Sequence, residues 1–380
     1  MVVTQDMKNY IADCQEELKQ LIRDLCAIPA PSGHEQQRAA FCKNWFEKAG
    51  GKGVYIDEAL NVVCPHHVTP EKPVVVFMAH TDTVFPDLEP MPFVETEATF
   101  QCPGVGDDTA NLAVMMICAR YFIQKDIPSK SGILFVANSS EEGLGNLKGS
   151  RAIVDAFGSR MEALITFDGF ALNKLVNAAV GSHRYRVTVR TEGGHSFGAF
   201  GNRNAIAVLS SIISTLYSVK VPQEGSSKTT YNVGTIQGGT SVNTIAQEAE
   251  MLYEYRSDSL LCLQKMQEMF RKVVEAYRAT GVEIDVVLVG DRPCAAGVDA
   301  AAHEKLCAMA VDSIHRVTGL EANILSGSTD CNASMAKGIP SLCIGLCVTS
   351  GIHTRTETLQ LSSLPDGCRL CMDFLCHYFD

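Results

Sequence analysis

Residues 74–86 of the chain read VVVFMAHTDTVFP. This stretch opens with a valine-rich apolar run, which predicts a β-strand buried on both of its faces. The run ends in His80-Thr81-Asp82-Thr83. A buried strand that delivers a histidine and an aspartate at its carboxyl end raises the question of what these polar side chains do there.

Strands of this kind alternate with helices along the first half of the chain. Helices are expected at 7–26, from about 32 to 48 and at 108–124, and strands at 54–67, 73–80, 131–143 and 163–169. Ser32 is expected to cap the second helix, with Glu35 as its capping-box partner. Strands that alternate with helices indicate a mostly parallel sheet covered on both faces.

The pattern changes near residue 180. Segments 183–196, 229–239, 247–257 and 282–290 alternate polar and apolar residues, as half-exposed strands do, and 202–219 and 260–280 indicate helices. After residue 292 the α/β pattern resumes. We therefore expect a catalytic α/β domain at 1–180 and 291–380, with a mostly parallel sheet flanked by helices. An α+β domain at 181–290, an antiparallel sheet plus two helices, is inserted into it.

Composition and charge exclude several classes of protein. The 380 residues are 46% hydrophobic and 20% charged, which is typical of a globular chain, and the net charge of −11 argues against nucleic acid or an anionic membrane as a partner. The first twenty residues lack the pattern of a signal peptide, and no apolar run is long enough to span a bilayer. A cytoplasmic protein is expected, with its 15 cysteines as core thiols.

Polar residues follow several of the predicted strands, where doubly wound sheets bind their ligands. They are His80 with Asp82, Asp107 with Asp108, Glu141 with Glu142, Asp168, and His353 in a later loop. Imidazoles and carboxylates without a cysteine suit two divalent ions with mixed nitrogen and oxygen ligands.

Each of these groups has a physical role available to it. Asp82 can accept a hydrogen bond from the His80 ring and fix its orientation. One of the two adjacent glutamates can bind metal while the other acts as a general base, and Asp107 can bridge two ions.

The same residues also have plainer interpretations. Paired acids are common at helix starts and on solvated faces, and Asp168 could simply form a turn. His66-His67 lies between Pro65 and VTPEKP and indicates an exposed loop without a function.

The motifs taken together resemble those of the co-catalytic zinc exopeptidases and deacylases, which include peptidase T, carboxypeptidase G, aminoacylase and succinyl-diaminopimelate desuccinylase. The resemblance rests on PSGHE, MAHTDTV, GVGDDTANLAV, NSSEEGLGNLKG, TFDG, GGHSFGAFGNRNAI, GGTSVNTIAQEAEMLYEYRS and SGIHTRTETLQL, which occur in the family's order over nearly the whole chain. TFDG and HTRTETLQL look most like the peptidase T branch. Thr109 departs from the family, many members of which have a lysine there.

The resemblance implies a role for each candidate residue. One zinc would take His80 and Asp168, the other Glu142 and His353, and Asp107 would bridge the two. Asp82 would orient His80, and Glu141 would be the base. Cobalt or manganese could replace zinc. The inserted domain would act as a lid and form a homodimer, and its His195, Asn243 and Arg256 would hold the substrate. The plainer interpretation of the last two is a strand-edge asparagine and a surface arginine.

The sequence therefore predicts a metallopeptidase that cleaves a terminal amide bond of small peptides, with Glu141 taking a proton from the attacking water. An N-acyl amino acid deacylase or desuccinylase with the same two ions is the nearest alternative. A metal-dependent phosphoesterase is less favoured because no Walker-type phosphate loop is present. A non-catalytic binding protein of the same fold is the remote alternative.

Overall fold

The computed structural model describes residues 1–379, which divide into two compact units, each with its own hydrophobic core. Unit 1 consists of Met1–Ala179 and the chain from Ala296 onward, and unit 2 is Val180–Ala295. Unit 1 is thus built from both ends of the chain. Among the described residues, no helix has both the length and the apolar character needed to cross a bilayer.

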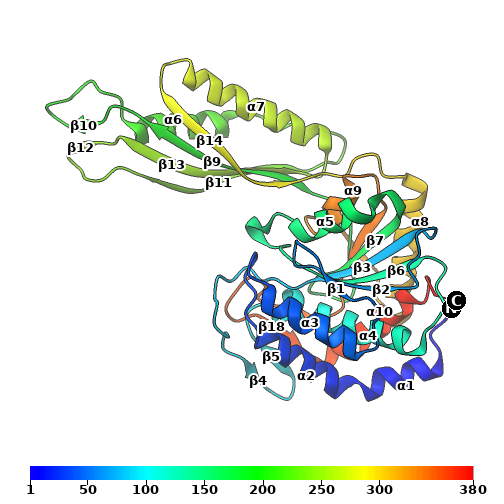
Figure 1. The fold of residues 1–380 in the computed structure, drawn as a ribbon. Coiled ribbons are helices and arrows are strands. Elements are labelled where there is room, and N and C mark those ends of the chain that lie inside the picture. The colour runs from blue at the N-terminus through cyan, green and yellow to red at the C-terminus, as the bar shows by residue number, and fades with distance from the viewer. Residues whose placement is uncertain (380) are drawn as a thin grey trace. The chain divides into compact units, whose positions relative to one another are not determined.

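The main sheet of unit 1 is mixed and mostly parallel, as predicted. In spatial order, its strands among the described residues are β1 (Tyr55–Ile56), β2 (Val62–His66), β6 (Gly132–Asn138), β3 (Val74–His80), β7 (Met161–Phe167), β16 (Ser341–Ile344), β8 (Lys174–Ala179) and β15 (Asn323–Gly327). The central strands β6, β3, β7 and β16 run parallel to one another. Their carboxyl ends therefore meet at one edge of the sheet (Figure 1).

Strand β3 is buried along its whole length because helices cover both faces of the sheet. Phe77 lies at its centre and stacks on Phe135 of β6 and Phe167 of β7, with ring centroids 6.1 and 6.0 Å away. Phe77 therefore packs against both neighbouring parallel strands at the middle of the unit 1 core.

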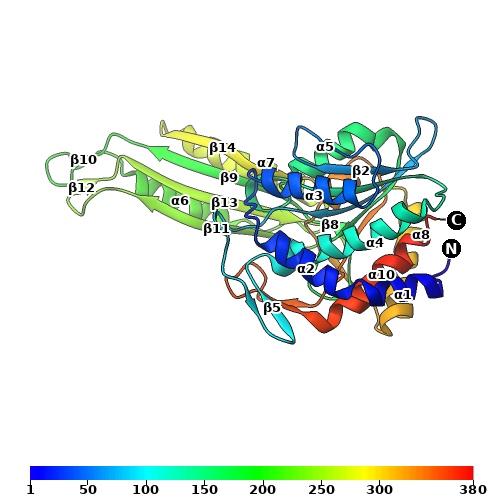
Figure 2. The same ribbon diagram turned by 60° about the horizontal axis from the view of Figure 1, so that its bottom comes forward.

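Helices lie on both faces of this sheet (Figures 1 and 2). Those of unit 1 are α1 (Gln5–Asp13), α2 (Gln15–Cys26), α3 (Gln36–Lys48), α4 (Asn111–Lys125), α5 (Lys148–Phe157), α8 (Ala300–Thr318), α9 (Cys331–Met335) and α10 (Leu364–Leu375). Helix α4 packs on β3 with α10 beneath it, and α5 and α9 cover the opposite face (Figure 1). A small second sheet joins β17 (Thr349–Ser350), β18 (Thr358–Gln360), β5 (Thr99–Gln101) and β4 (Val94–Glu95).

Two predictions about helices in this unit are wrong, and the strand expected at 54–67 forms as two separate strands, β1 and β2. The helix expected at 7–26 is interrupted at Cys14, which is the C-cap of α1 and the N-cap of α2. The Ser32–Glu35 capping box does not form, since α3 begins one residue after Glu35 and has no side-chain cap. Ser32 and Glu35 instead bond to groups far along the chain, because tertiary contacts outweigh the local motif.

Unit 2 is the expected α+β unit. Its main sheet is antiparallel, in the order β11 (Thr229–Gly238), β13 (Glu248–Ser257), β9 (Gly181–Arg190) and β14 (Glu283–Arg292). Helices α6 (Ala205–Ser218) and α7 (Leu260–Arg278) pack on β9 and β13. A short ribbon pairs β10 (Gly194–His195) with β12 (Thr244–Ile245). The role of this unit as a lid and dimerisation domain stays a prediction.

The three-strand aromatic stack predicts the effect of removing its central ring. Phe77→Ala should lower the free energy of unfolding of unit 1 by about 3–5 kcal/mol, because it leaves a cavity between strands that cannot close. Urea denaturation followed by fluorescence or circular dichroism measures this. Leu88→Ala serves as the control, because Leu88 is 66% exposed, and should change stability by less than about 0.5 kcal/mol. Equal effects of the two substitutions would contradict the assignment of Phe77 to the core.

Candidate metal centre

The predicted acids and imidazoles of unit 1 meet at the carboxyl edge of the parallel strands. His80 ends β3, and its register partner Asn138 ends β6 three residues before Glu141. Asp168 follows the last residue of β7. These residues form three overlapping groups of three, and within each group one donor atom of every residue lies within 4.8 Å of the other two. The groups are His80–Asp107–Asp168, His80–Glu141–Glu142 and Asp107–Glu142–His353. The structure thus brings together six residues from five separate stretches of chain.

Asp107 stands between two imidazoles. Its Oδ1 lies 3.1 Å from His80 Nε2, and its Oδ2 lies 3.1 Å from His353 Nε2. His353 Nε2 is also 3.0 Å from Glu142 Oε1. Each oxygen of one carboxylate therefore faces a different potential ligand group, which is the arrangement that a bridging carboxylate needs.

The His80 ring is fixed on its other side by Asp82. His80 Nδ1 lies 3.0 Å from the backbone carbonyl of Asp82 and 3.4 Å from the Asp82 carboxylate. The nearer acceptor is the carbonyl, so a hydrogen bond from Nδ1–H to the main chain would leave Nε2 to face the centre.

The Asp82 carboxylate has a second task that the sequence did not reveal. Its Oδ1 accepts the backbone N–H of Glu141 and its Oδ2 that of Glu142, both at 2.9 Å. Ser32 donates a further hydrogen bond to Oδ2 at 2.6 Å. Asp82 therefore positions the loop that carries both glutamates.

Two more buried glutamates hold loops of the centre, and sequence reasoning assigned neither this role. Glu357 accepts the backbone N–H groups of Gly104, Gly106 and Asp107 at 3.1, 2.7 and 2.8 Å. Glu35 accepts the backbone N–H of Ser140 at 3.0 Å. Both residues lie in motifs that carried the family resemblance, but their spacing from the ligands gives no signal of these contacts.

Asp108 differs from its neighbour although the sequence cannot separate them. It is fully buried, and it accepts hydrogen bonds from the His80 backbone N–H at 2.9 Å and from Asn111 Nδ2 at 2.7 Å. Burial raises its pKa well above the usual range. Asp108 thus faces the interior and supports the His80 backbone, whereas Asp107 faces the two imidazoles.

The electrostatics of the centre favour positive charge between the acids. Hydrogen bonds to Asp107 and Glu142 raise the pKa of His353 to about 10. Burial opposes ionisation of Asp107, but the His353 and His80 imidazoles outweigh it and hold the pKa of this carboxyl well below its usual range. Imidazole nitrogens among carboxylate oxygens are a donor set that fits divalent zinc, cobalt or manganese.

Asp168 has a partner that the sequence analysis did not predict. Lys174 Nζ lies 3.8 Å from Asp168 Oδ1, and its stem packs across Gly169, where an added Cβ would lie 2.5 Å from Lys174 Cδ. Burial lowers the pKa of Lys174, but Asp168 and further acids outweigh it and raise the pKa overall. A fixed ammonium group thus neighbours one candidate ligand.

The three predicted substrate-binding residues all lie in unit 2, and the structure groups only two of them. His195 and Thr244 are register partners in the β10–β12 ribbon, so His195 lies close to Asn243, whose carbonyl accepts the Ser196 N–H at 2.9 Å. Arg256 lies near the far end of β13, in a two-point ion pair with Glu254 at 2.9 and 3.0 Å. Their role in binding substrate stays a prediction.

The comparisons with known proteins agree with this architecture. Residues 76–377 match Peptidase family M20/M25/M40. The uncharacterized protein YqjE of Bacillus subtilis is 25% identical over 373 residues, which cover 91% of this chain and 95% of that protein. A succinyl-diaminopimelate desuccinylase of Corynebacterium glutamicum is 25% identical over 361 residues, covering 93% and 95%. The fold is shared with aminopeptidase PepT from Bacillus cereus, with a TM-score of 0.74, 20% identity and coverage of 95% and 97%.

The different positions of the two adjacent aspartates predict different effects on metal content. Asp107→Asn should reduce the bound metal, because the amide cannot offer two anionic oxygens to two ions. Asp108→Asn is the matched control. It should keep the metal and cost only about 1–3 kcal/mol of stability, since one buried hydrogen bond is lost. Elemental analysis of the dialysed variants measures the metal. Metal loss confined to Asp108→Asn would contradict the assignment.

Proposed function

The chain belongs to peptidase family M20/M25/M40, and from this premise we propose that it cleaves the terminal amide bond of small peptides at a dinuclear centre. Family membership makes it a hydrolase of the metallopeptidase type. The observation that carries the proposal is the Asp107 carboxylate between His80 and His353, with each of its oxygens 3.1 Å from one imidazole.

The donor sets indicate which residues would hold the two ions. His80 and Asp168 would hold one, Glu142 and His353 the other, and Asp107 would contribute an oxygen to each. When bound, two such ions polarise a carbonyl group and make water more acidic. The side chains proposed to carry the ions are kept in place by Asp82 and by Glu357, which bond to the backbone of their loops.

Glu141 is the proposed general base. It is buried, with 5% of its surface exposed, and a donor atom of its side chain lies within 4.8 Å of those of His80 and Glu142. Its backbone N–H is bound to Asp82, so the start of its side chain is fixed. In the proposed reaction the Glu141 carboxylate takes a proton from the attacking water and later gives it to the leaving nitrogen. This separation of roles lets Glu142 serve as ligand and Glu141 as base.

The substrate class is the finer part of the proposal. We favour short peptides with a free amino group, on the motifs TFDG and HTRTETLQL and on the fold shared with an aminopeptidase PepT. An N-acyl amino acid is the alternative, because a succinyl-diaminopimelate desuccinylase and YqjE are each 25% identical to this chain.

We also propose that unit 2 forms a homodimer. Strand β11 lies at the edge of the unit 2 sheet, so one of its sides pairs with no other strand of that sheet and could pair with a second copy. Its Ile236 is also exposed. The proposals that unit 2 acts as a lid, that its His195 binds the substrate and that zinc is the native ion rest on the family resemblance.

Replacing the proposed base should separate catalysis from metal binding. Glu141→Gln should lower kcat by about 10²–10⁴-fold, the range that a general base contributes, while metal content stays at the wild-type level. Steady-state kinetics and elemental analysis on the same preparation provide both numbers. Full activity in this variant would exclude Glu141 as the base.

A substrate panel should separate the two substrate classes. With zinc, cobalt or manganese present, tripeptides with a free amine should be cleaved with a higher kcat/KM than the same peptides carrying an N-succinyl or N-acetyl group. Release of the new amine measures cleavage of both kinds of substrate in one assay. A preference for the N-acylated compounds would favour the deacylase alternative.

A further inference from the structure

A second group of metal-type side chains lies at the opposite end of the unit 1 sheet. His66 is the last residue of β2 and pairs with Ile133 near the start of β6, whereas Glu141 and Glu142 follow the other end of β6. The six residues from Ile133 to Asn138 alone span roughly 16 Å in a strand. This group is therefore separate from the dinuclear centre.

The sequence predicts an exposed loop at His66-His67, and for His66 this prediction is wrong. His66 is 6% exposed and belongs to β2. Consecutive strand residues normally point to opposite sides. His67, however, has a φ of 52°, which turns the chain, and its ring stacks on that of His66 with centroids 4.0 Å apart. Both imidazoles therefore lie together.

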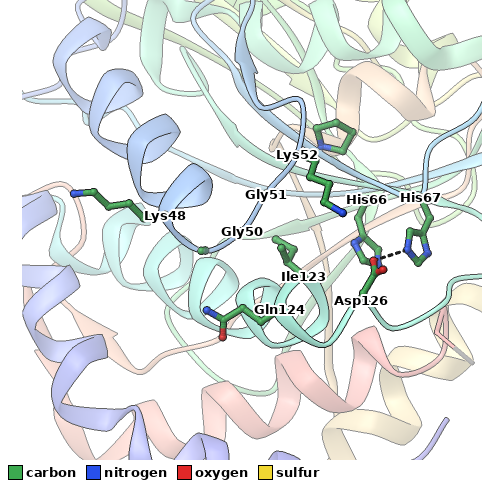
Figure 3. Close-up of a pocket in the computed structure, with 11 residues that line it drawn as sticks. Lys48, Gly50, Gly51, Lys52, His66, His67, Ile123, Gln124 and Asp126 are labelled. Carbon is green, nitrogen blue, oxygen red and sulfur yellow. Dashed lines mark hydrogen bonds and ion pairs between the residues drawn. The ribbon is translucent and has the colours of Figure 1, made fainter.

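Asp126 completes the group from a different element. It is the C-cap of α4 in a left-handed conformation, with a φ of 49° and a ψ of 42°. Its Oδ1 lies 2.9 Å from His67 Nε2 (Figure 3). His66 Nε2 lies 2.9 Å from the carbonyl of Ile127, the next residue. The two rings are thus held against the chain segment that carries the carboxylate.

One donor atom each from His66, His67 and Asp126 lies within 4.8 Å of the others. The three residues line a surface cavity of about 580 Å³, which Figure 3 shows together with Lys52 and the Gly50-Gly51 turn. We propose that His66, His67 and Asp126 form a third metal site, which binds a divalent transition metal such as zinc and is distinct from the dinuclear centre.

The chemistry of the donors selects the kind of ion. Two imidazoles and one carboxylate suit zinc, copper, nickel or cobalt and give too few oxygen ligands for calcium or magnesium. The cavity leaves room for water to complete the coordination.

Two lysines line the cavity and oppose a cation, Lys48 and Lys52, and Lys52 is the one directed toward the histidines (Figure 3). Its ammonium extends toward His66 in Figure 3, and Lys52 is exposed on a turn. A long exposed side chain can move into solvent, so it weakens binding without blocking it. An ion at this position would connect the end of β2 to the end of α4 and stabilise unit 1.

The test is a zinc titration of the full-length enzyme already loaded with its catalytic ions, followed by isothermal calorimetry. Wild type should bind a third ion. His67→Asn and Asp126→Asn should each weaken that binding by about tenfold or more. Both variants should fold, because asparagine tolerates the left-handed conformation at each position. His315→Asn is the matched control, because His315 is an exposed histidine that is not one of the three proposed ligands. It pairs with Glu321 at 3.9 Å on the surface.

Two further readouts sharpen the outcome. Lys52→Ala should tighten zinc binding, because it removes a like charge. Peptide hydrolysis should be unchanged in His67→Asn, which separates this site from the catalytic one. A wild-type protein that binds only the catalytic ions, or a third ion retained in both His67→Asn and Asp126→Asn, would overturn the proposal. So would inorganic phosphate binding that Lys52→Ala abolishes, since the cavity would then be an anion site.

Discussion

Several carboxylates are buried close together at the carboxyl edge of the parallel strands, and they repel one another unless positive charge lies between them. Asp82, Glu141 and Glu142 are buried there beside His80, and the side chain of Asp107 is 15% exposed. A buried carboxylate without a compensating charge would cost several kcal/mol. Positive charge between them removes that cost. The pKa of His353 is raised for the same reason, because Asp107 and Glu142 stabilise the protonated imidazole. The proposed ions would therefore stabilise this part of the fold as well as supply its chemistry.

Buried carboxylates also build the scaffold of the centre. Asp82, Glu35 and Glu357 each accept backbone N–H groups from a loop that carries a candidate ligand or the proposed base. A side chain on such a loop has little freedom to leave its position, and catalysis depends on positions held within fractions of an ångström. The loops are thus tied to residues far away in the sequence, which explains why the motifs of this chain are spread over its whole length.

The sequence predicted what depends on local pattern and missed what depends on tertiary contact. The buried run at 74–80 and the polar residues after each strand were sufficient to predict the fold and the candidate ligands. The Ser32–Glu35 motif failed because both side chains bond to distant partners. Asp107 and Asp108 are equivalent in the sequence, and only their orientation separates them. No pattern predicted that Lys174 would neighbour Asp168, or that His67 would turn back onto His66.

The Asp107 carboxylate is proposed to lie between two ions. Anomalous X-ray diffraction from zinc-loaded crystals, recorded at the zinc absorption edge, tests it most directly. We predict two anomalous peaks about 3.5–4 Å apart, one beside His80 and Asp168 and the other beside Glu142 and His353, with an Asp107 oxygen directed at each. A single peak, or two peaks that do not share Asp107, would contradict the account.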